Sequence, residues 1–256
     1  MTMRTVRWGR AVLGEGMPKI AVPVMGKSIE QLAKAAQRAA SARADVIELR
    51  IDSLSPMPDA DTALAACRAV REAAGEIPLL FTLRTRRDGG PGSADIAAYE
   101  ALLCAVARAK VCEAIDCELS AGDEAFARVA AVAHDVGVSL VGSSHAFETG
   151  TPPERAKAWL LRQRALGADV CKAAVMAADE LEALRLSAAM LEASREMDAP
   201  IIAIAMGPKG TLSRVGAECL GSCLTFGTAG EASAPGQLDA KTLRGVLEAI
   251  HCAVVK

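Results

Sequence analysis

Charged side chains stand inside segments that otherwise have the composition of buried strands. In the run VIELRID (46–52), Glu48, Arg50 and Asp52 alternate with apolar residues, so an extended strand places all three on one face. Arg84 repeats this pattern near the end of another apolar run. Unpaired ions in a protein interior cost several kcal/mol each, so these groups must pair with one another or with a charged ligand.

A single lysine and a single histidine stand out in the same way. Lys172 lies on an otherwise apolar face of DVCKAAVM (169–176), and His145 ends the preceding strand-like run. A desolvated lysine loses its proton readily, and the neutral amine attacks carbonyls to form imines. A lysine that extends to water from a strand end is the commoner case, and that interpretation stays open for Lys172 alone. An imidazole beside it would form an acid–base pair, which favours imine chemistry on a carbonyl compound.

The elements that must position these residues alternate regularly along the chain. The expected strands are 19–26, 46–52, 78–85, 111–119, 139–147, 169–176, 200–207 and 223–228. The expected helices are 28–42, 58–74, 95–109, 121–135, 153–166, 179–196, about 211–220 and 239–252. Eight strand–helix pairs in 256 residues predict an α/β fold, a parallel (β/α)8 TIM barrel. A doubly wound open sheet would leave two open edges, and the chain has no dinucleotide-binding fingerprint.

One domain is expected for the whole chain, residues 1–256, with the barrel over 19–252. Residues 4–14 precede the first strand–helix pair and are expected to form a short β-hairpin that covers the bottom of the barrel. Catalytic groups of such barrels come from the C-terminal ends of the strands, where His145 and Lys172 are expected to meet.

Composition excludes several classes of function. The net charge of −2 and the 3% of aromatic residues argue against a nucleic-acid partner. No apolar run approaches the roughly 20 residues of a membrane span, and the first residues lack the apolar stretch of a signal peptide. Eight scattered cysteines without a C-x-x-C pair are typical of reduced thiols, which indicates a cytoplasmic protein. The three histidines lack the spacing of metal ligands, and no P-loop occurs, so neither metal nor cofactor is expected.

Six segments in chain order carry a family resemblance: ELRID, FTLRTRRDGG, SSHAFETGTP, ADVCKAAVM, MGPKGTLSRVGAECLGSCLTFG and ASAPGQL. From about residue 17 to the end, the chain resembles type I 3-dehydroquinate dehydratase, the Schiff-base lyase of the shikimate pathway, which leads to aromatic amino acids. The resemblance implies a cytoplasmic (β/α)8 barrel, usually a homodimer, that needs no metal or cofactor. Its substrate would be the small molecule 3-dehydroquinate, which loses water to give 3-dehydroshikimate.

The same resemblance implies a role for each matching residue. Lys172 is similar to the imine-forming lysine and His145 to the general acid–base, while Asp88 stands where many members have a glutamate that orients the histidine. The remaining matches are Glu48, Arg50, Arg84 and Arg214 as charged groups around the substrate, Met206 as an apolar wall, and Ser233 and Gln237 on a loop that folds over the ligand.

Two departures and two alternatives accompany the resemblance. Asp88 is one methylene shorter than glutamate, and Ile204 and Ala205 replace a common Met-Ser pair before Met206, which softens the pocket wall. A class I aldolase-like barrel would also use a strand-six lysine. A barrel that senses quinate-like ligands without catalysis is the alternative of a different class.

Overall fold

The computed structural model describes residues 5–230 and 234–255. Its central feature is a curled parallel sheet whose strand order is β11-β10-β3-β4-β5-β6-β7-β8-β9. The eight barrel strands are β3 (Lys19–Val24), β4 (Val46–Arg50), β5 (Leu79–Thr82), β6 (Ala114–Glu118), β7 (Ser139–Ala146), β8 (Val170–Met176), β9 (Ile201–Met206) and β10 (Leu224–Thr228). The sheet closes where a parallel bridge joins Ile201 to Ser222, just before β10. The predicted (β/α)8 barrel is therefore confirmed.

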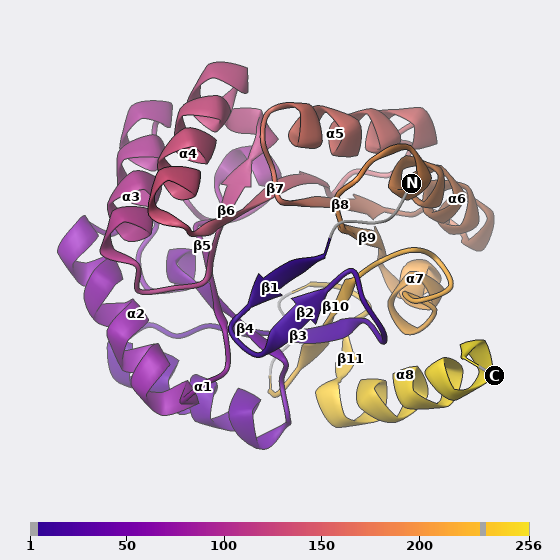
Figure 1. The fold of residues 1–256 in the computed structure, drawn as a ribbon, viewed down its shortest axis with the longest axis horizontal. Coiled ribbons are helices and arrows are strands. Elements are labelled where there is room, and N and C mark those ends of the chain that lie inside the picture. The colour runs from indigo at the N-terminus through magenta and orange to yellow at the C-terminus, as the bar shows by residue number, and fades with distance from the viewer. Residues whose placement is uncertain (1–4, 231–233, 256) are drawn as a thin grey trace.

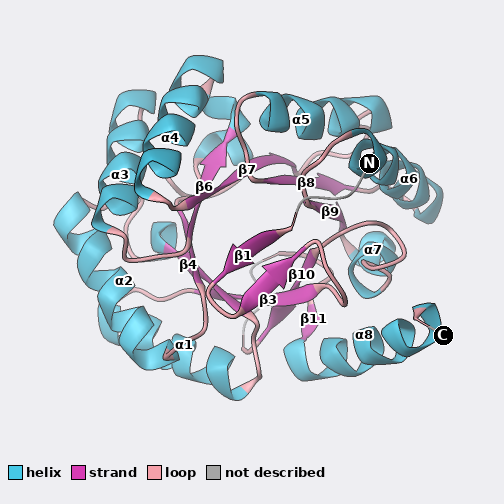
Figure 2. Ribbon diagram, in the orientation of Figure 1, coloured by secondary structure: helices cyan, strands magenta, loops and turns pink. Residues whose placement is uncertain are grey.

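Helices form an outer ring around this sheet (Figure 2). They are α1 (Ile29–Ser41), α2 (Ala60–Ala74), α3 (Ile96–Ala109), α4 (Asp123–Val136), α5 (Pro153–Ala165), α6 (Glu180–Glu196), α7 (Thr211–Val215) and α8 (Ala240–Val254). Four of them begin at an aspartate whose carboxylate accepts a backbone N–H of the first turn: Asp59, Asp95, Asp179 and Asp239. Such caps satisfy donors that a helix leaves unpaired at its start, so these starts are set locally by the sequence.

Small residues allow the helices to pack closely on the strands. The layer between sheet and helices is built from buried Val, Leu and Ile and from many alanines, together with Cys67, Cys117 and Cys171. Cys171, the neighbour of Lys172, faces this layer and not the interior of the barrel. Burial raises the pKa of the Cys171 thiol to about 12, which makes it unreactive at neutral pH.

The bottom of the barrel is covered by a hairpin of β1 (Val6–Trp8) and β2 (Ala11–Leu13). Figure 1 views the molecule from this end, with the hairpin lying across the barrel in the foreground. Trp8 and Leu13 are wholly buried and belong to the same apolar cluster as Val46, Leu80 and other inward residues near the strand starts. The predicted hairpin and its position are confirmed.

Several expected boundaries are wrong. Strand β5 ends at Thr82 instead of residue 85, so Arg84 lies beyond it, and β6 begins at Ala114 instead of residue 111. Strand β4 ends at Arg50, because the chain turns into a 3-10 turn over Ile51–Ser53, so Asp52 is not on the strand. Helix α7 ends at Val215 instead of near residue 220, since Gly216 caps it and a series of turns follows. The short strand β11 (Leu238–Asp239), which pairs with β10, was not expected. Within the described ranges, no helix combines the length and the apolar character needed to cross a membrane.

Candidate active site

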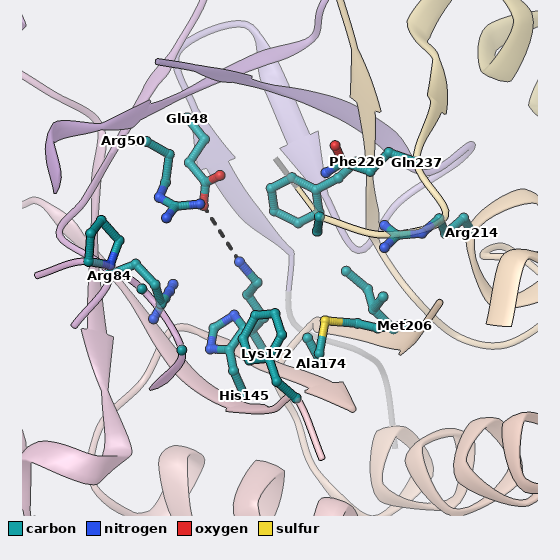
Figure 3. Close-up of a pocket in the computed structure, with 16 residues that line it drawn as sticks. Glu48, Arg50, Arg84, His145, Lys172, Ala174, Met206, Arg214, Phe226 and Gln237 are labelled. Carbon is teal, nitrogen blue, oxygen red and sulfur yellow. Dashed lines mark ion pairs between the residues drawn. The ribbon is translucent and has the colours of Figure 1, made fainter. Parts of the chain in front are cut away.

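A cavity of about 270 Å³ opens at the C-terminal end of the barrel strands. Figure 3 shows the Lys172 side chain pointing toward Glu48, with His145 beside it and with Met206 and Arg214 on the opposite side. The lining residues are Glu48, Arg50, Arg84, Gly89, Gly90, Pro91, His145, Phe147, Lys172, Ala174, Ile204, Met206, Arg214, Phe226, Ala234 and Gln237. Charged groups of β4, β7 and β8 and of the loop after β5 thus meet apolar residues of β9 and β10 in one small space.

Lys172 lies on the inward face of β8 and is only 4% exposed. Its Nζ is 3.6 Å from Oε1 of Glu48 and 4.4 Å from the ring centroid of Phe226. Burial lowers the pKa of Lys172, and the carboxylates of Glu48 and Asp116 oppose this effect only in part. The arginines Arg84 and Arg50 lower it further, but desolvation is the larger cause, so the amine owes its lowered pKa mainly to the dry interior.

His145 is held by a carboxylate from the loop after β5. Oδ2 of Asp88 lies 3.0 Å from both Nδ1 and the backbone N–H of His145. An ionised carboxylate only accepts hydrogen bonds, so the proton resides on Nδ1 and the neutral ring keeps Nε2 free to act as a base. Burial, with the charges of Arg84 and Lys172, lowers the pKa of His145 well below its ordinary value, and Asp116 opposes them. Asp88 therefore reaches His145 despite its shorter side chain, because the 3-10 turn Arg86–Asp88 brings it close.

Two groups on β4 face the same cavity. The guanidinium of Arg50 makes two hydrogen bonds to Asp52, at 3.0 and 2.7 Å. Burial alone would lower the pKa of Arg50, but Asp52 and Glu48 outweigh it and the net change is upward. Glu48 accepts a hydrogen bond from Thr82 at 3.3 Å. The cluster expected from VIELRID is present, although Asp52 joins it from a turn and not from the strand.

Arg84 lines the cavity, but its guanidinium is directed to carboxylates that the sequence analysis missed. Nη2 donates to Asp116 and Nη1 to Glu118, each at 2.9 Å, and Nη1 also donates to Ser143 at 3.0 Å. Asp116 and Glu118 are wholly buried on β6. The alternation of VCEAIDCEL, which places both carboxylates on the inward face, carried the same signal as VIELRID and could have identified them.

On the opposite side, the guanidinium of Arg214 from α7 is incompletely hydrogen-bonded. It is 1% exposed, and Nη2 donates to the backbone oxygen of Pro235 at 3.0 Å. Nε and Nη1 are buried and have no hydrogen-bond partner in the part of the chain that the structure describes. Burial lowers the pKa of Arg214 to about 10. An anion in the cavity would supply the missing acceptors, and a planar guanidinium is suited to a carboxylate.

The structure brings most of the predicted site residues together. The cavity wall includes eight of them: Glu48, Arg50, Arg84, His145, Lys172, Met206, Arg214 and Gln237. Asp88 lies outside the wall, against His145, and Ser233 lies outside the described residues. Ile204 forms part of the wall, whereas Ala205 faces the helices, so only the first of the two replacements alters the pocket.

Phe147 and Phe226 are cavity residues that the sequence analysis did not identify. Aromatic residues in strands are ordinarily core residues, and nothing in their spacing distinguishes these two. Over residues 5–230 and 234–255, no cluster of three or more His, Cys, Asp or Glu side chains could hold a metal ion.

Comparisons with known proteins show the family of this chain. The sequence profile of the family described as Type I 3-dehydroquinase matches residues 20–253. A 3-dehydroquinate dehydratase of Salmonella paratyphi B is 36% identical over 252 residues, which are 98% of this chain and 100% of that protein.

Solved structures give the same result. The crystal structure of 3-dehydroquinate dehydratase from Geobacillus kaustophilus superposes with a TM-score of 0.93 at 32% identity, covering 97% of each chain. The type I enzyme from Clostridium difficile, solved with covalently modified comenic acid, gives a TM-score of 0.89 at 34% identity over 99% of this chain and 100% of that one. With a buried lysine and a carboxylate-held histidine at the strand ends of its barrel, the chain belongs to the type I 3-dehydroquinase family.

Proposed function

We propose that this barrel is a hydro-lyase of the shikimate pathway, which converts 3-dehydroquinate to 3-dehydroshikimate and water for aromatic amino acid biosynthesis. The observation that carries the proposal is the Lys172 amine, buried in the cavity with a lowered pKa and beside a histidine that Asp88 orients. No metal or cofactor takes part in the proposed steps.

The amine of Lys172 attacks the C3 ketone of the substrate, and loss of water gives an imine. Protonation of the imine makes it an electron sink for the neighbouring C2 carbon. Nε2 of His145 then removes a proton from C2, which gives an enamine. Glu48, 3.6 Å from the Lys172 nitrogen, supplies negative charge beside the cationic imine.

His145 acts a second time in the elimination. Its imidazolium returns the proton to the C1 hydroxyl, which leaves as water while the enamine electrons form the new double bond. Hydrolysis of the imine releases the conjugated enone and restores the amine of Lys172. One group serving as base and then as acid accounts for typically 10²- to 10⁴-fold of the acceleration.

Binding of the substrate is assigned to the remaining predicted residues. Nε and Nη1 of Arg214, which have no partner among the described residues, are assigned to the C1 carboxylate. Glu48, Arg50 and Arg84 face the ring hydroxyls, Met206 forms an apolar wall, and Gln237 with Ser233 belongs to the loop over the ligand. The fixed positions of Arg50 and Arg84, each held by carboxylates, favour a single substrate orientation.

Borohydride trapping tests this proposal. Reduction in the presence of 3-dehydroquinate should leave a stable adduct on the Lys172 peptide, detected by mass spectrometry. Lys172→Ala should give neither adduct nor turnover, whereas Lys34→Ala, which removes an exposed lysine of α1, should give both. An active enzyme with an unmodified Lys172 peptide would rule out the imine, and a large loss of thermal stability in Lys172→Ala would indicate a structural lysine.

The two alternative functions differ in the product formed. An aldolase-like enzyme would cleave a C–C bond, and a ligand sensor would bind without producing an enone that absorbs ultraviolet light. Family membership and the joint presence of Lys172 and His145 favour the dehydration.

We further propose that residues 1–256 form one domain and that the protein acts as a homodimer in the cytoplasm. Six of the eight cysteines are buried free thiols, which is compatible with a reducing compartment. Light scattering of the purified protein would give the oligomeric state, and calorimetry with a single unfolding transition would support one domain.

A further inference from the structure

A closed group of polar side chains lies on the wall of the barrel next to the proposed catalytic pair. Asp116 of β6 is wholly buried and accepts two hydrogen bonds, from Nη2 of Arg84 at 2.9 Å and from the hydroxyl of Ser143 at 2.7 Å. Glu118 accepts from Nη1 of Arg84 and from the backbone N–H and hydroxyl of Thr85. None of the chemical steps proposed above uses either carboxylate.

Sheet register places this group beside both catalytic residues. Ser143 is opposite Lys172 in the pairing of β7 with β8, and it precedes His145 by two residues on the same inward face. The hydroxyl of Ser143 points to Asp116 on the neighbouring strand. Asp116 is therefore fixed one strand away from Ser143, with Arg84 and Ser143 determining where its charge lies.

Turnover creates positive charge next to this position. A cationic imine forms at Lys172 and an imidazolium forms at His145, both in an interior that burial makes unfavourable for cations. Glu48 lies beside the lysine, whereas Asp88 is engaged at the far nitrogen of the imidazole. We infer that Asp116 is a positioning residue for the dehydration: held by Arg84 and Ser143, its carboxylate supplies fixed negative charge that stabilises the cations formed at Lys172 and His145. This inference rests on the proposed function.

The pKa values of Asp116 and Glu118 are shifted in opposite directions. Burial raises the pKa of Asp116, but Arg84 and Lys172 outweigh it, so the net change is downward and the carboxylate stays ionised. Burial raises the pKa of Glu118, Asp88 adds to this, and the net change is upward despite Arg84. Glu118 therefore offers a matched control, because its carboxylate comes from the same strand and accepts a hydrogen bond from the same arginine, Arg84. The charged and titratable groups that surround Lys172 and His145 are Glu48 and Arg50 of β4, Arg84 in the loop after β5, Asp88 of the following turn, Asp116 and Glu118 of β6, and Arg214 of α7.

The test compares Asp116→Asn with Glu118→Gln in two measurements over a range of pH. The first is the rate of borohydride trapping, which needs the neutral amine. The trapping rate should rise with pH as Lys172 loses its proton. Because Asp116 raises the pKa of Lys172, removal of the Asp116 charge should move this rising limb of the pH–rate curve toward acid by roughly one pH unit. The second is kcat at its plateau, which should fall about tenfold or more with less than a threefold change in KM. Glu118→Gln should leave the limb within about 0.3 unit of the wild type.

These two effects move in opposite directions, since the amine becomes available at lower pH while turnover slows. A merely structural role of Asp116 would lower both the trapping rate and kcat through loss of folded protein, and it would not move the rising limb of the pH–rate curve. An unchanged limb in Asp116→Asn, or an equal shift in Glu118→Gln, would overturn the inference.

Two further comparisons keep the result interpretable. If Asp116→Asn does not fold, Arg84→Gln and the double variant Arg84→Gln/Asp116→Asn differ only in the Asp116 charge, and the same acid shift is expected between them. Trapping in the wild type separates the two proposals: no Lys172 adduct would refute the proposed function, whereas a normal adduct with no effect of Asp116 would refute only this inference.

Discussion

At the scale of single residues, the environment of Lys172 determines when its amine can react. Its pKa is lowered from the ordinary value of 10.5 by burial, with Glu48 and Asp116 opposing. The neutral amine is the attacking species, so adduct formation should increase with pH through this lowered pKa and level off above it. We expect the midpoint below 10.5 when borohydride trapping is followed at saturating substrate. A midpoint at or above that value would show that the interior does not favour the neutral amine.

His145 is the second residue whose role can be isolated. His145→Ala removes the base but leaves the lysine, so the imine should still be trapped while kcat falls by about 10²- to 10⁴-fold. His134→Ala is the control, because His134 lies on α4, contacts Asp169 and is absent from the cavity wall. Steady-state assays of enone formation measure kcat for both variants. Near-normal turnover in His145→Ala would remove this residue from the mechanism.

Residue chemistry was predictable where a charge stood alone in an apolar run. Lys172, Glu48 and Arg50 were found in this way. The ion pairs of Lys172 with Glu48 and of Arg50 with Asp52 follow from the cost of buried ions. Asp116 and Glu118 carried the same alternation but were not considered. The unpaired donors of Arg214 could not be predicted, because they depend on how a five-residue helix is placed against the loop at Pro235.

At the scale of elements, the loop after β5 must pass very close to the end of β7. Gly89 has a φ of +77°, and a Cβ at this position would lie 2.2 Å from the Phe147 ring. Gly89→Ala should therefore displace either the ring or the turn that carries Asp88. Since misplacement of a catalytic group by about 1 Å can cost 10²-fold, we expect kcat/KM to fall by about that factor.

Gly137→Ala is the matched control for this loop. Gly137 also has a φ of +77° but caps α4 with nothing near its Cβ position, so the same backbone strain should lower stability without lowering kcat. Equal kcat/KM losses in both variants would show that strain, and not the contact with Phe147, is responsible.

Element positions followed closely from local signals. Aspartate caps mark four helix starts, and the eight barrel strands lie within the expected apolar runs. The ends of the strands were less predictable, because the chain turns there into the loops around the cavity. Asp52 continues the alternation of β4, yet it lies in a turn, where it accepts hydrogen bonds from its neighbour Arg50 and, across the sheet, from the backbone N–H of Arg84.

At the scale of the whole molecule, the two ends of the barrel separate stability from catalysis. Trp8 is wholly buried at the hairpin end, whereas the cavity lies at the opposite ends of the strands.

Trp8→Ala should lower the free energy of unfolding by about 3–5 kcal/mol, as is typical for a buried aromatic side chain. Denaturant unfolding measures this change, and kcat below the unfolding transition should be unaltered. Arg7→Ala, on the exposed face of the same strand, should change stability little. A loss of kcat in folded Trp8→Ala would show that the two ends are coupled.

The barrel itself could be predicted because its signal is repeated eight times, so an error in one element does not change the whole. The closure of the sheet could not be read in the same way. It depends on the bridge between Ile201 and Ser222 and on the hydrogen bond from Cys223 N–H to Ile201 O. No local sequence pattern predicts these contacts.

The hairpin across the bottom has a practical consequence. Because β1 and β2 lie at the face opposite the cavity, a surface, affinity tag or fused protein joined through a spacer ahead of this hairpin would leave the substrate opening unobstructed. Immobilised preparations oriented by that end should retain the turnover of the free enzyme, whereas coupling through lysines at random would block a fraction of the molecules.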